Sequence, residues 1–230
     1  MIIDTSSIFK HWTRPPKKQF PSYMCVYKGF QGDGKSLSMI FDAFRIKDDF
    51  PDCVIFSNTY LFGIEYNFFS TVGELMDALR FKNGENGVLI IIDEAQNWFN
   101  KKSGVPLDVM RQFCGNRKNR RCIMMTTQIW DDLDVPVRKQ VYKVISCNCY
   151  AKKWQFNKVS NGYKLKYDKQ ENEYIAPKLY SVFFKHCDEY YNRYDTFETI
   201  NTNKEIDTSL TMSAGRASPT PSTTINIRRK

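Results

Sequence analysis

Several features that define other classes of protein are scarce in this sequence of 230 residues. No run approaches the ~18 consecutive apolar residues of a membrane-spanning helix, and the N-terminus lacks the basic start and apolar stretch of a secretion signal. Histidine occurs only as His11 and His186, each alone, which argues against a nucleophile activated by histidine. The sequence therefore predicts no integral membrane segment and a location in the cytoplasm, where the chain is made.

Cysteine is present but not in a pattern that predicts disulfides or a metal site. The seven cysteines are odd in number and scattered, and most lie within apolar runs. Cys147 and Cys149 form a single Cys-x-Cys without the second pair that a zinc site needs. We therefore interpret the cysteines as reduced core thiols of a cytosolic protein.

The most informative motif is the loop of residues 29–36, which reads G-x-x-x-x-G-K-S between an apolar, β-prone run and a helical pattern. Gly29, Gly32 and Gly34 permit a tight turn that exposes N–H groups to an anion, and the following helix adds the positive end of its dipole. The alternative is a glycine-rich turn without a ligand. We favour a phosphate-binding P-loop because the strand and helix context is correct.

The P-loop assignment predicts a nucleotide site with magnesium. Lys35 is expected to reach the β- and γ-phosphates of ATP, and the Ser36 hydroxyl is expected to ligate Mg²⁺. The predicted nucleotide-binding residues are Gly29, Phe30, Gln31, Gly32, Asp33, Gly34, Lys35, Ser36 and Leu37.

Two carboxylates follow a strand that is predicted to be buried. Residues 88–92 are an unalternating aliphatic run, typical of a parallel strand covered by helices on both faces. Asp93 and Glu94 come directly after it, where hydrolytic P-loop proteins carry a Walker B aspartate and a catalytic glutamate. Asp93 is expected to hold Mg²⁺ through water, and Glu94 to orient or deprotonate the attacking water. The alternative is an ordinary strand end, where acids are common.

The rest of the pattern predicts an α/β fold with a mainly parallel central sheet, flanked by helices and extended by a C-terminal β-hairpin. Further strands are expected at residues 23–28, 53–57, 122–127 and 141–150, and a short strand or helix at 174–186. The hairpin is expected over residues 154–167, with Asn161-Gly162 as its two-residue turn. Helices are expected after the P-loop, from Ser70 or Thr71, and from Pro106; the last two carry the predicted core stripes Val72, Leu75, Met76, Leu79 and Leu107, Met110, Phe113, Cys114.

The composition suggests three parts. Residues 1–21 are polar and interrupted by proline, and they are expected to form an extended N-terminal segment. Residues 22–198 form the predicted P-loop ATPase domain, including the hairpin. Residues 199–230 are rich in Ser and Thr, end in Arg-Arg-Lys and are expected to be disordered. This basic tail either contacts DNA or a capsid protein, or only keeps the chain soluble.

The charge favours a polyanionic partner. The formal net charge is +9, and the excess is clustered. In a P-loop protein this balance favours nucleic acid over a small-molecule acceptor. The basic groups are Arg111, Arg117, Lys118, Arg120 and Arg121; then Arg138, Lys139, Lys143, Lys152 and Lys153; and finally Arg228, Arg229 and Lys230.

Gln128 follows the strand predicted at residues 122–127. A polar residue at the end of the strand beside the Walker B strand can sense the γ-phosphate or position water. An exposed glutamine without a role is the alternative.

Residues 88–138 resemble a known family as a set. The block from Leu89 to Phe99, which contains Asp-Glu-Ala-Gln, the strand end Thr-Thr-Gln128, and the segment from Asp132 to Arg138 resemble the zonula occludens toxin-like ATPases of filamentous phages. These belong to the FtsK–HerA branch of P-loop motors, with the genome-packaging ATPases of membrane-containing viruses. The resemblance covers about residues 22–145 and implies a RecA-like sheet, a homo-oligomeric ring and ATP hydrolysis coupled to DNA movement.

The resemblance also implies an arginine supplied by a neighbouring subunit. Family members often carry Arg-His after the helix that follows Walker B, and this sequence has Arg117-Lys118 there. Arg117 is therefore the first candidate, followed by Arg120, Arg121 and Arg138. Filamentous-phage members usually carry a transmembrane helix after the ATPase domain; its absence here favours a soluble packaging ATPase.

We predict an ATP-hydrolysing motor that packages or translocates viral DNA during virion assembly. Its expected partners are DNA and capsid or portal-vertex proteins, in the host cytoplasm and in association with the virion. A nucleotide-dependent assembly, export or scaffold protein without DNA translocation is the alternative. A small-molecule kinase is disfavoured, because no acceptor site or lid is evident and because Asp-Glu after the strand suits water as the acceptor.

Overall fold

The computed structural model of the chain describes residues 19–170, 173–186 and 192–194. Residues 1–18 of the predicted N-terminal segment and the whole predicted tail lie outside them. The helices are α2 (Lys35–Asp49), α3 (Val72–Arg80), α4 (Leu107–Cys114) and α5 (Val135–Arg138). The strands are β1 (Met24–Lys28), β2 (Val54–Ser57), β3 (Asn67–Phe68), β4 (Val88–Ile92), β5 (Arg121–Thr127), β6 (Val141–Tyr150), β7 (Trp154–Asn161), β8 (Lys166–Asp168), β9 (Glu173–Ile175) and β10 (Lys178–Lys185).

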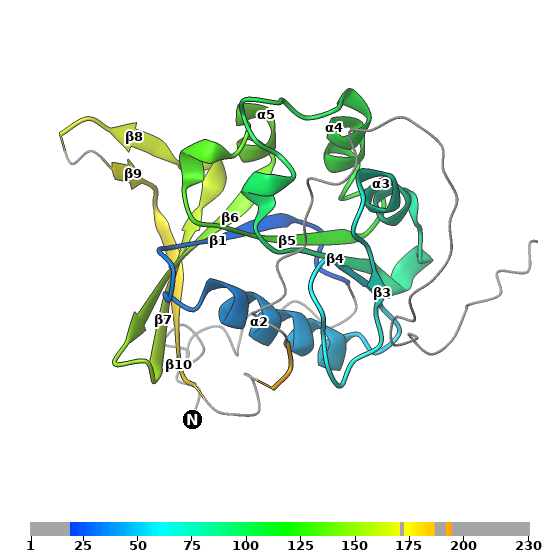
Figure 1. Cartoon of the computed structure of the whole chain (residues 1–230), viewed down its shortest axis with the longest axis horizontal. Helices are drawn as coiled ribbons and strands as arrows, with labels where there is room; N and C mark the ends of the chain where they lie inside the picture. The colour runs from blue at the N-terminus through cyan, green and yellow to red at the C-terminus, as the bar shows by residue number, and fades with distance from the viewer. Residues whose placement is uncertain (1–18, 171–172, 187–191, 195–230) are drawn as a thin grey trace, which may run out of the picture.

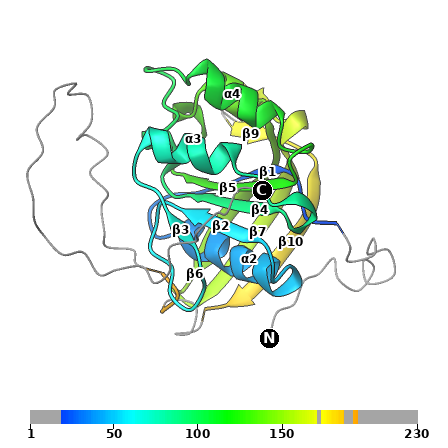
Figure 2. The ribbon, with the colours of Figure 1, turned by 90° about the vertical axis from the view of Figure 1, so that its right-hand side faces the viewer.

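Eight strands form one sheet in the order β10-β7-β6-β1-β5-β4-β2-β3. The pairs from β6 through β3 are all parallel, and β7 and β10 extend the β6 edge in antiparallel pairing. Helix α2 covers one face, while α3, α4 and α5 cover the other (Figures 1 and 2). The predicted mainly parallel sheet with flanking helices is confirmed.

The two covered faces explain the aliphatic strand at the centre. All five residues of β4 are buried, because one set of side chains packs toward α2 and the alternate set toward α3 and α4. Such a strand needs no polar alternation, since neither face meets water. The prediction for residues 88–92 is confirmed.

The residues predicted to form the hairpin were wrong. β7 pairs with β6 through a turn in which Ala151 and Lys152 have φ of 49° and 53°, and Lys153 N donates to Tyr150 O at 3.1 Å. Positive φ at both central residues is the geometry preferred between twisted strands, here achieved without Asn or Gly. Gly162 serves another purpose: a Cβ there would lie 2.3 Å from the Val141 carbonyl oxygen. The Asn-Gly signal therefore marked a close backbone approach rather than the hairpin turn.

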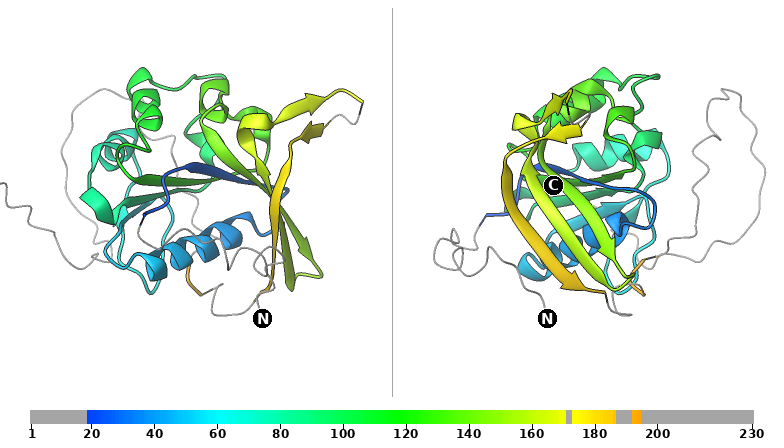
Figure 3. Two further views of the ribbon diagram at one scale, coloured as in Figure 1. Left: turned by 180° about the vertical axis from the view of Figure 1, so that it is seen from behind. Right: turned by 90° about the vertical axis from the view of Figure 1, so that its left-hand side faces the viewer.

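Residues 174–186, which were predicted as a short strand or helix, contain parts of two strands. β8 and β9 pair with each other in a separate two-stranded sheet, which we call the arm, and the arm projects from the body of the molecule (Figure 3). Its base is held by the Tyr174 hydroxyl, which donates to the Asp131 carboxylate, and by the Arg138 guanidinium, which bonds both groups. The arm is therefore tied to the segment that follows β5.

The predicted core stripe of α4 was also wrong in part. Val109 and Phe113 are buried, whereas Leu107 is 67% exposed and Cys114 is exposed. At about 100° per residue, Leu107 and Cys114 fall well over 90° from the direction shared by Val109 and Phe113. In α3, Leu75 and Leu79 are buried as predicted, with Ala78 beside them, and Val72 is 52% exposed.

The first turn of α3 is closed by a reciprocal cap. Glu74 N donates to the Thr71 hydroxyl at 3.2 Å, and Thr71 N donates to the Glu74 carboxylate at 3.1 Å. Thr71→Ala should lower the free energy of unfolding by about 1 kcal/mol, as measured by urea denaturation. Thr71→Ser keeps the hydroxyl and should be close to the wild type. Equal losses in both variants would show that the methyl group, not the cap, stabilises the helix start.

Candidate nucleotide-binding site

Three predicted functional segments follow neighbouring strands at one edge of the sheet. β5 lies between β1 and β4, with Lys28 paired to Thr127 and Ile92 paired to Met125. Because these strands are parallel, the P-loop after β1, the acidic pair after β4 and Gln128 after β5 share the carboxyl edge. Ligands of open α/β sheets bind outside this edge.

The P-loop is a compact turn closed by its own groups. Phe30 N donates to the Asp33 carboxylate at 2.6 Å, and Asp33 N donates to Phe30 O at 3.2 Å. The Lys35 ammonium donates to the same Phe30 carbonyl at 2.9 Å. The loop is therefore held in a defined shape within the chain, and Lys35 already reaches across it.

The predicted nucleotide-binding residues differ in whether their side chains are exposed or buried. Phe30 is 81% exposed, and Gln31 and Gly32 are also exposed at the tip of the loop. The Leu37 side chain packs in the core at 1% exposure, so only its main-chain N–H, in the first turn of α2, is free to face a ligand. The motif specifies which residues form the loop. It does not specify whether the side chain or the main chain of each residue faces a ligand.

Ser36 and Asp93 meet across 57 residues of chain. The Ser36 hydroxyl lies 3.0 and 3.2 Å from the two carboxylate oxygens of Asp93. Both predicted metal ligands are thus brought together, and both offer oxygen atoms, which Mg²⁺ prefers. Within the described ranges, no group of three or more His, Cys, Asp or Glu side chains is arranged to hold a metal ion.

Two residues to which the sequence analysis assigned no role fix the acidic pair. The Asn58 side chain accepts from Asp93 N at 2.7 Å and donates to Asp93 O at 2.9 Å. The Thr126 hydroxyl donates to the Asp93 carboxylate and accepts from Glu94 N at 2.8 Å. Each is a polar residue at the end of a strand that adjoins β4. Neighbouring strand order, which only the fold supplies, was needed to connect them to Asp93.

Glu94 has a backbone conformation that is unusual for a residue with a side chain. Its φ and ψ are 52° and 53°, in the left-handed region that costs non-glycine residues about 1–2 kcal/mol. The Thr126 hydroxyl holds its N–H, and its exposed carboxylate accepts from Asn97 Nδ2 at 2.9 Å. Glu94 therefore does not continue β4, and it directly precedes a 3-10 turn at Ala95–Asn97. Strain of this kind is common at functional sites.

Gln128 and the four candidate arginines are placed very differently. Gln128 is exposed directly after β5. Arg117 is exposed in the turn before β5, at the opposite edge of the sheet from the P-loop. Arg120 pairs with Glu85 at 3.1 Å.

Arg121 and Arg138 are also committed within the chain. Arg121 is fully buried with a bond to the Gln112 carbonyl at 3.5 Å, and this burial lowers the pKa of its guanidinium to about 10. Arg138 is bonded to Asp131 at the base of the arm. Of the four candidates, only Arg117 is exposed and has a guanidinium without a bond to another described residue.

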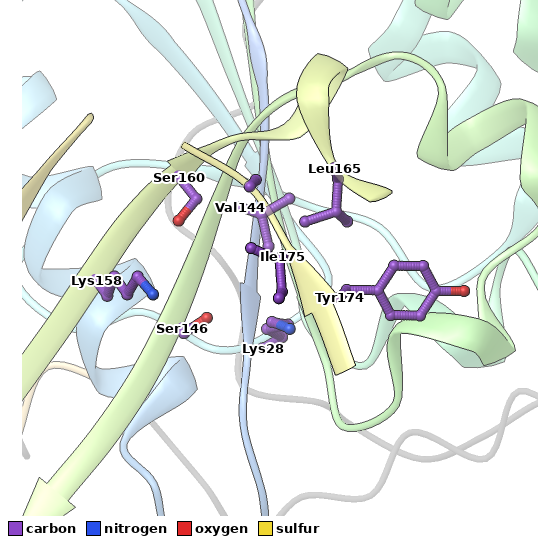
Figure 4. Close-up of a pocket in the computed structure, with 9 residues that line it drawn as sticks. Lys28, Val144, Ser146, Lys158, Ser160, Leu165, Tyr174 and Ile175 are labelled. Atoms are coloured by element: carbon purple, nitrogen blue, oxygen red, sulfur yellow. The ribbon is translucent and has the colours of Figure 1, made fainter. Parts of the chain in front are cut away.

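A small cavity lies next to the strand that carries the P-loop. It measures about 150 Å³ and is enclosed between β1, β6, β7 and the arm (Figure 4). Lys28, the last residue of β1, lines it, and the cavity lies on the face of the sheet opposite α2. The lining residues are Lys28, Val144, Ser146, Lys158, Ser160, Leu165, Tyr174, Ile175 and Ala176.

The parallel sheet with its carboxyl-edge loops defines a RecA-like P-loop NTPase fold. A model of the zonular occludens toxin (Zot) family matches residues 45–176, more than half of the sequence. The chain therefore belongs to the Zot family. A comparison with curated proteins found no match. Among the residues that the structure describes, no helix has the length and apolar character needed to cross a membrane.

Solved structures of similar fold come from bacteria and viruses. The N-terminal domain of zonular occludens toxin from Neisseria meningitidis is 18% identical, with a TM-score of 0.57 over 76% of this chain and 99% of that one. B204, the DNA-packaging ATPase from Sulfolobus turreted icosahedral virus, is 15% identical, with a TM-score of 0.50 over 68% and 97%. The genome-packaging NTPase B204 of Sulfolobus turreted icosahedral virus 2, solved with ATP-gammaS, is 18% identical, with a TM-score of 0.47 over 55% and 75%.

Proposed function

We propose that this chain is an ATP-hydrolysing, oligomeric motor that packages or translocates viral DNA during virion assembly. The observation that carries the proposal is the contact of Ser36 with Asp93, beside an exposed Glu94 whose N–H donates to the Thr126 hydroxyl. The B204 DNA-packaging ATPase has the same fold, and the proposal extends its activity to this chain. The expected location is the host cytoplasm, with association with the virion.

The P-loop and Lys35 bind the triphosphate of ATP. Main-chain N–H groups of the loop and of the first turn of α2 face the anion. On binding, the Lys35 ammonium exchanges the Phe30 carbonyl, from which it now lies 2.9 Å, for the β- and γ-phosphate oxygens. This exchange replaces a neutral acceptor with a charged one, which strengthens the bond.

Ser36 and Asp93 are suited to hold Mg²⁺ together with the phosphates. When bound, the ion would supply positive charge that neutralises the charge developing on the phosphates during transfer. The Ser36 hydroxyl is the expected direct ligand, and the Asp93 carboxylate is expected to act through water. Asn58 and Thr126 keep Asp93 in place for this role.

Glu94 activates the attacking water. Its carboxylate is exposed at the carboxyl edge and is oriented by Asn97, so it can accept a proton from water in line with the γ-phosphate. Gln128, after the adjacent strand, contacts the γ-phosphate or the same water. These two residues come from different strand ends, as expected for a site assembled by the sheet.

The remaining charge is neutralised by Arg117 of a neighbouring subunit in a ring. Arg117 is the candidate whose guanidinium is not engaged elsewhere in the described chain. DNA and capsid or portal-vertex proteins are the proposed partners. The net charge of +9 supports a polyanion as the substrate that is moved.

ATPase assays with and without DNA test the motor directly. The wild-type chain should hydrolyse ATP, DNA should raise the turnover, and Lys35→Ala should remove it. Turnover that DNA does not change would favour an assembly, export or scaffold protein that uses ATP as a switch. A strict monomer in the presence of an ATP analogue and DNA, measured by mass, would contradict the ring.

A further inference from the structure

A glutamine from the C-terminal extension of the sheet touches the P-loop directly. Gln155 lies on β7 and is fully buried, and its side-chain Nε2 donates to the main-chain carbonyl of Asp33 at 2.8 Å. The two residues are 122 positions apart. A Cβ atom added to Gly34 would lie 2.1 Å from Gln155 Oε1, so the amide rests against the loop itself.

The orientation of this amide is determined by its other partners. Gln155 Nε2 also donates to Asn157 Oδ1 at 2.9 Å, so both of its N–H groups meet acceptors. Gln155 Oε1 must therefore accept, and it lies 2.9 Å from Nε2 of His186, which consequently carries the proton. Asn157 Oδ1 also accepts from the Ser38 hydroxyl in α2 at 3.4 Å. The amide is thus fixed from three sides.

Fixing the Asp33 carbonyl also fixes the next N–H. The peptide between Asp33 and Gly34 is trans, so its C=O and N–H point in opposite directions. Because the carbonyl points to Gln155, the Gly34 N–H points away from β7. Gly34 has φ of 72° and no side chain, and the bonds that close the loop, from Phe30 N and Asp33 N, do not involve the Asp33 carbonyl or the Gly34 N–H.

We propose that Gln155 is a positioning residue of the nucleotide site, which keeps the Gly34 N–H directed at the phosphates and prevents the Asp33 carbonyl from rotating toward them. A rotated peptide would present a carbonyl oxygen to an anion. The proposal rests on the proposed nucleotide site. It makes the strands added beyond β6 part of that site, although no residue of β7 belongs to the P-loop or Walker B motifs.

The test compares Gln155→Met with Val182→Ala in the full chain. Met keeps most of the length and volume of Gln155 and removes its hydrogen bonds. Val182 is a buried residue of β10, and truncating it weakens the same part of the sheet without touching the P-loop. The readouts are the Kd for a fluorescent ATP analogue, hydrogen exchange of residues 29–36 without nucleotide, and the Tm.

Gln155→Met should weaken analogue binding about tenfold, the loss expected for one buried hydrogen bond left unmade, and should speed exchange in the loop. Val182→Ala should lower the Tm while leaving both readouts near the wild type. Unchanged binding and exchange in Gln155→Met, or equal changes in Val182→Ala, would overturn the positioning role.

Two further outcomes distinguish a failure of the Gln155 proposal from a failure of the proposed nucleotide site. If Gln155→Met does not fold, His186→Ala is the deciding variant. It leaves the Gln155 amide in place but removes the donor to Oε1. It should speed loop exchange and weaken analogue binding, by less than is expected for Gln155→Met. If the wild-type chain does not bind the analogue, the nucleotide site fails. Loop exchange without nucleotide then still shows whether Gln155 holds the loop.

Discussion

Replacing Glu94 with Gln is expected to reduce ATP turnover by about 10²–10⁴-fold, the usual contribution of general acid–base catalysis, while leaving nucleotide binding unchanged. The amide has the shape of the carboxylate and can still accept from Asn97 Nδ2. It cannot take a proton from water. Binding should survive, because the P-loop, Lys35 and Ser36 are untouched.

The measurement is steady-state ATP hydrolysis beside the Kd for a fluorescent ATP analogue. Glu65→Gln is the matched control, since Glu65 is exposed and belongs to none of the P-loop, the acidic pair and the Gln128 position. The control should behave like the wild type in both assays. A Glu94→Gln protein that turns over ATP normally would remove Glu94 as the base. Weakened analogue binding would instead place Glu94 in the binding of nucleotide or magnesium.

Replacing Arg117 with Ala is expected to lower turnover by about 10³–10⁵-fold, the range for an arginine that neutralises the transferring phosphate in trans. The fold excludes action within one subunit. Arg117 precedes β5 and the P-loop lies beyond its other end, so the seven residues of β5 separate them by about 20 Å. The residue can therefore reach only the site of a neighbouring subunit.

Mixing two inactive variants tests this geometry. Lys35→Ala lacks the lysine that is proposed to bind phosphate but keeps Arg117, whereas Arg117→Ala keeps Lys35 and lacks the arginine. In mixed oligomers, a site on the Arg117→Ala subunit can receive the arginine of a Lys35→Ala neighbour. Equimolar mixing should therefore recover part of the wild-type turnover, whereas each variant alone should have almost none.

Lys118→Ala is the charge-matched control, because Lys118 is the exposed residue directly after Arg117. It should retain turnover in the presence of DNA. Loss in both variants would indicate that the turn binds DNA through its charge. Full turnover in Arg117→Ala would exclude the trans role, and Arg138 would be the next candidate, although it would first have to leave Asp131.

The local features of the site could be predicted from the sequence. Gly32 and Gly34 have the positive φ that the P-loop spacing implied, and α2 begins at Lys35 as the motif requires. The aliphatic run before Asp93 forms the buried strand that it indicated. These predictions succeeded because they depend on short-range rules, namely backbone freedom, helix starts and burial on both faces of a strand.

The wrong predictions have a common cause. The Asn-Gly pair at residue 161 was interpreted as a turn, but Gly162 is required by the approach of the Val141 carbonyl from a neighbouring strand. The stripe of α4 was read from apolar spacing, but packing against the sheet selected Val109 and Phe113. In both cases a local pattern fitted two structures, and a distant contact decided between them.

By itself, the sequence determined that a P-loop motif, an acidic pair and a buried central strand occur in this chain, because each is written in consecutive residues. Only the tertiary structure decided what holds them in place. Asn58, Thr126 and Gln155 reach Asp93, Glu94 and Asp33 from other strands, across 35, 32 and 122 residues, respectively. Strand order, which no short pattern encodes, brings these polar side chains to one edge, and it also places Arg117 beyond reach of its own site.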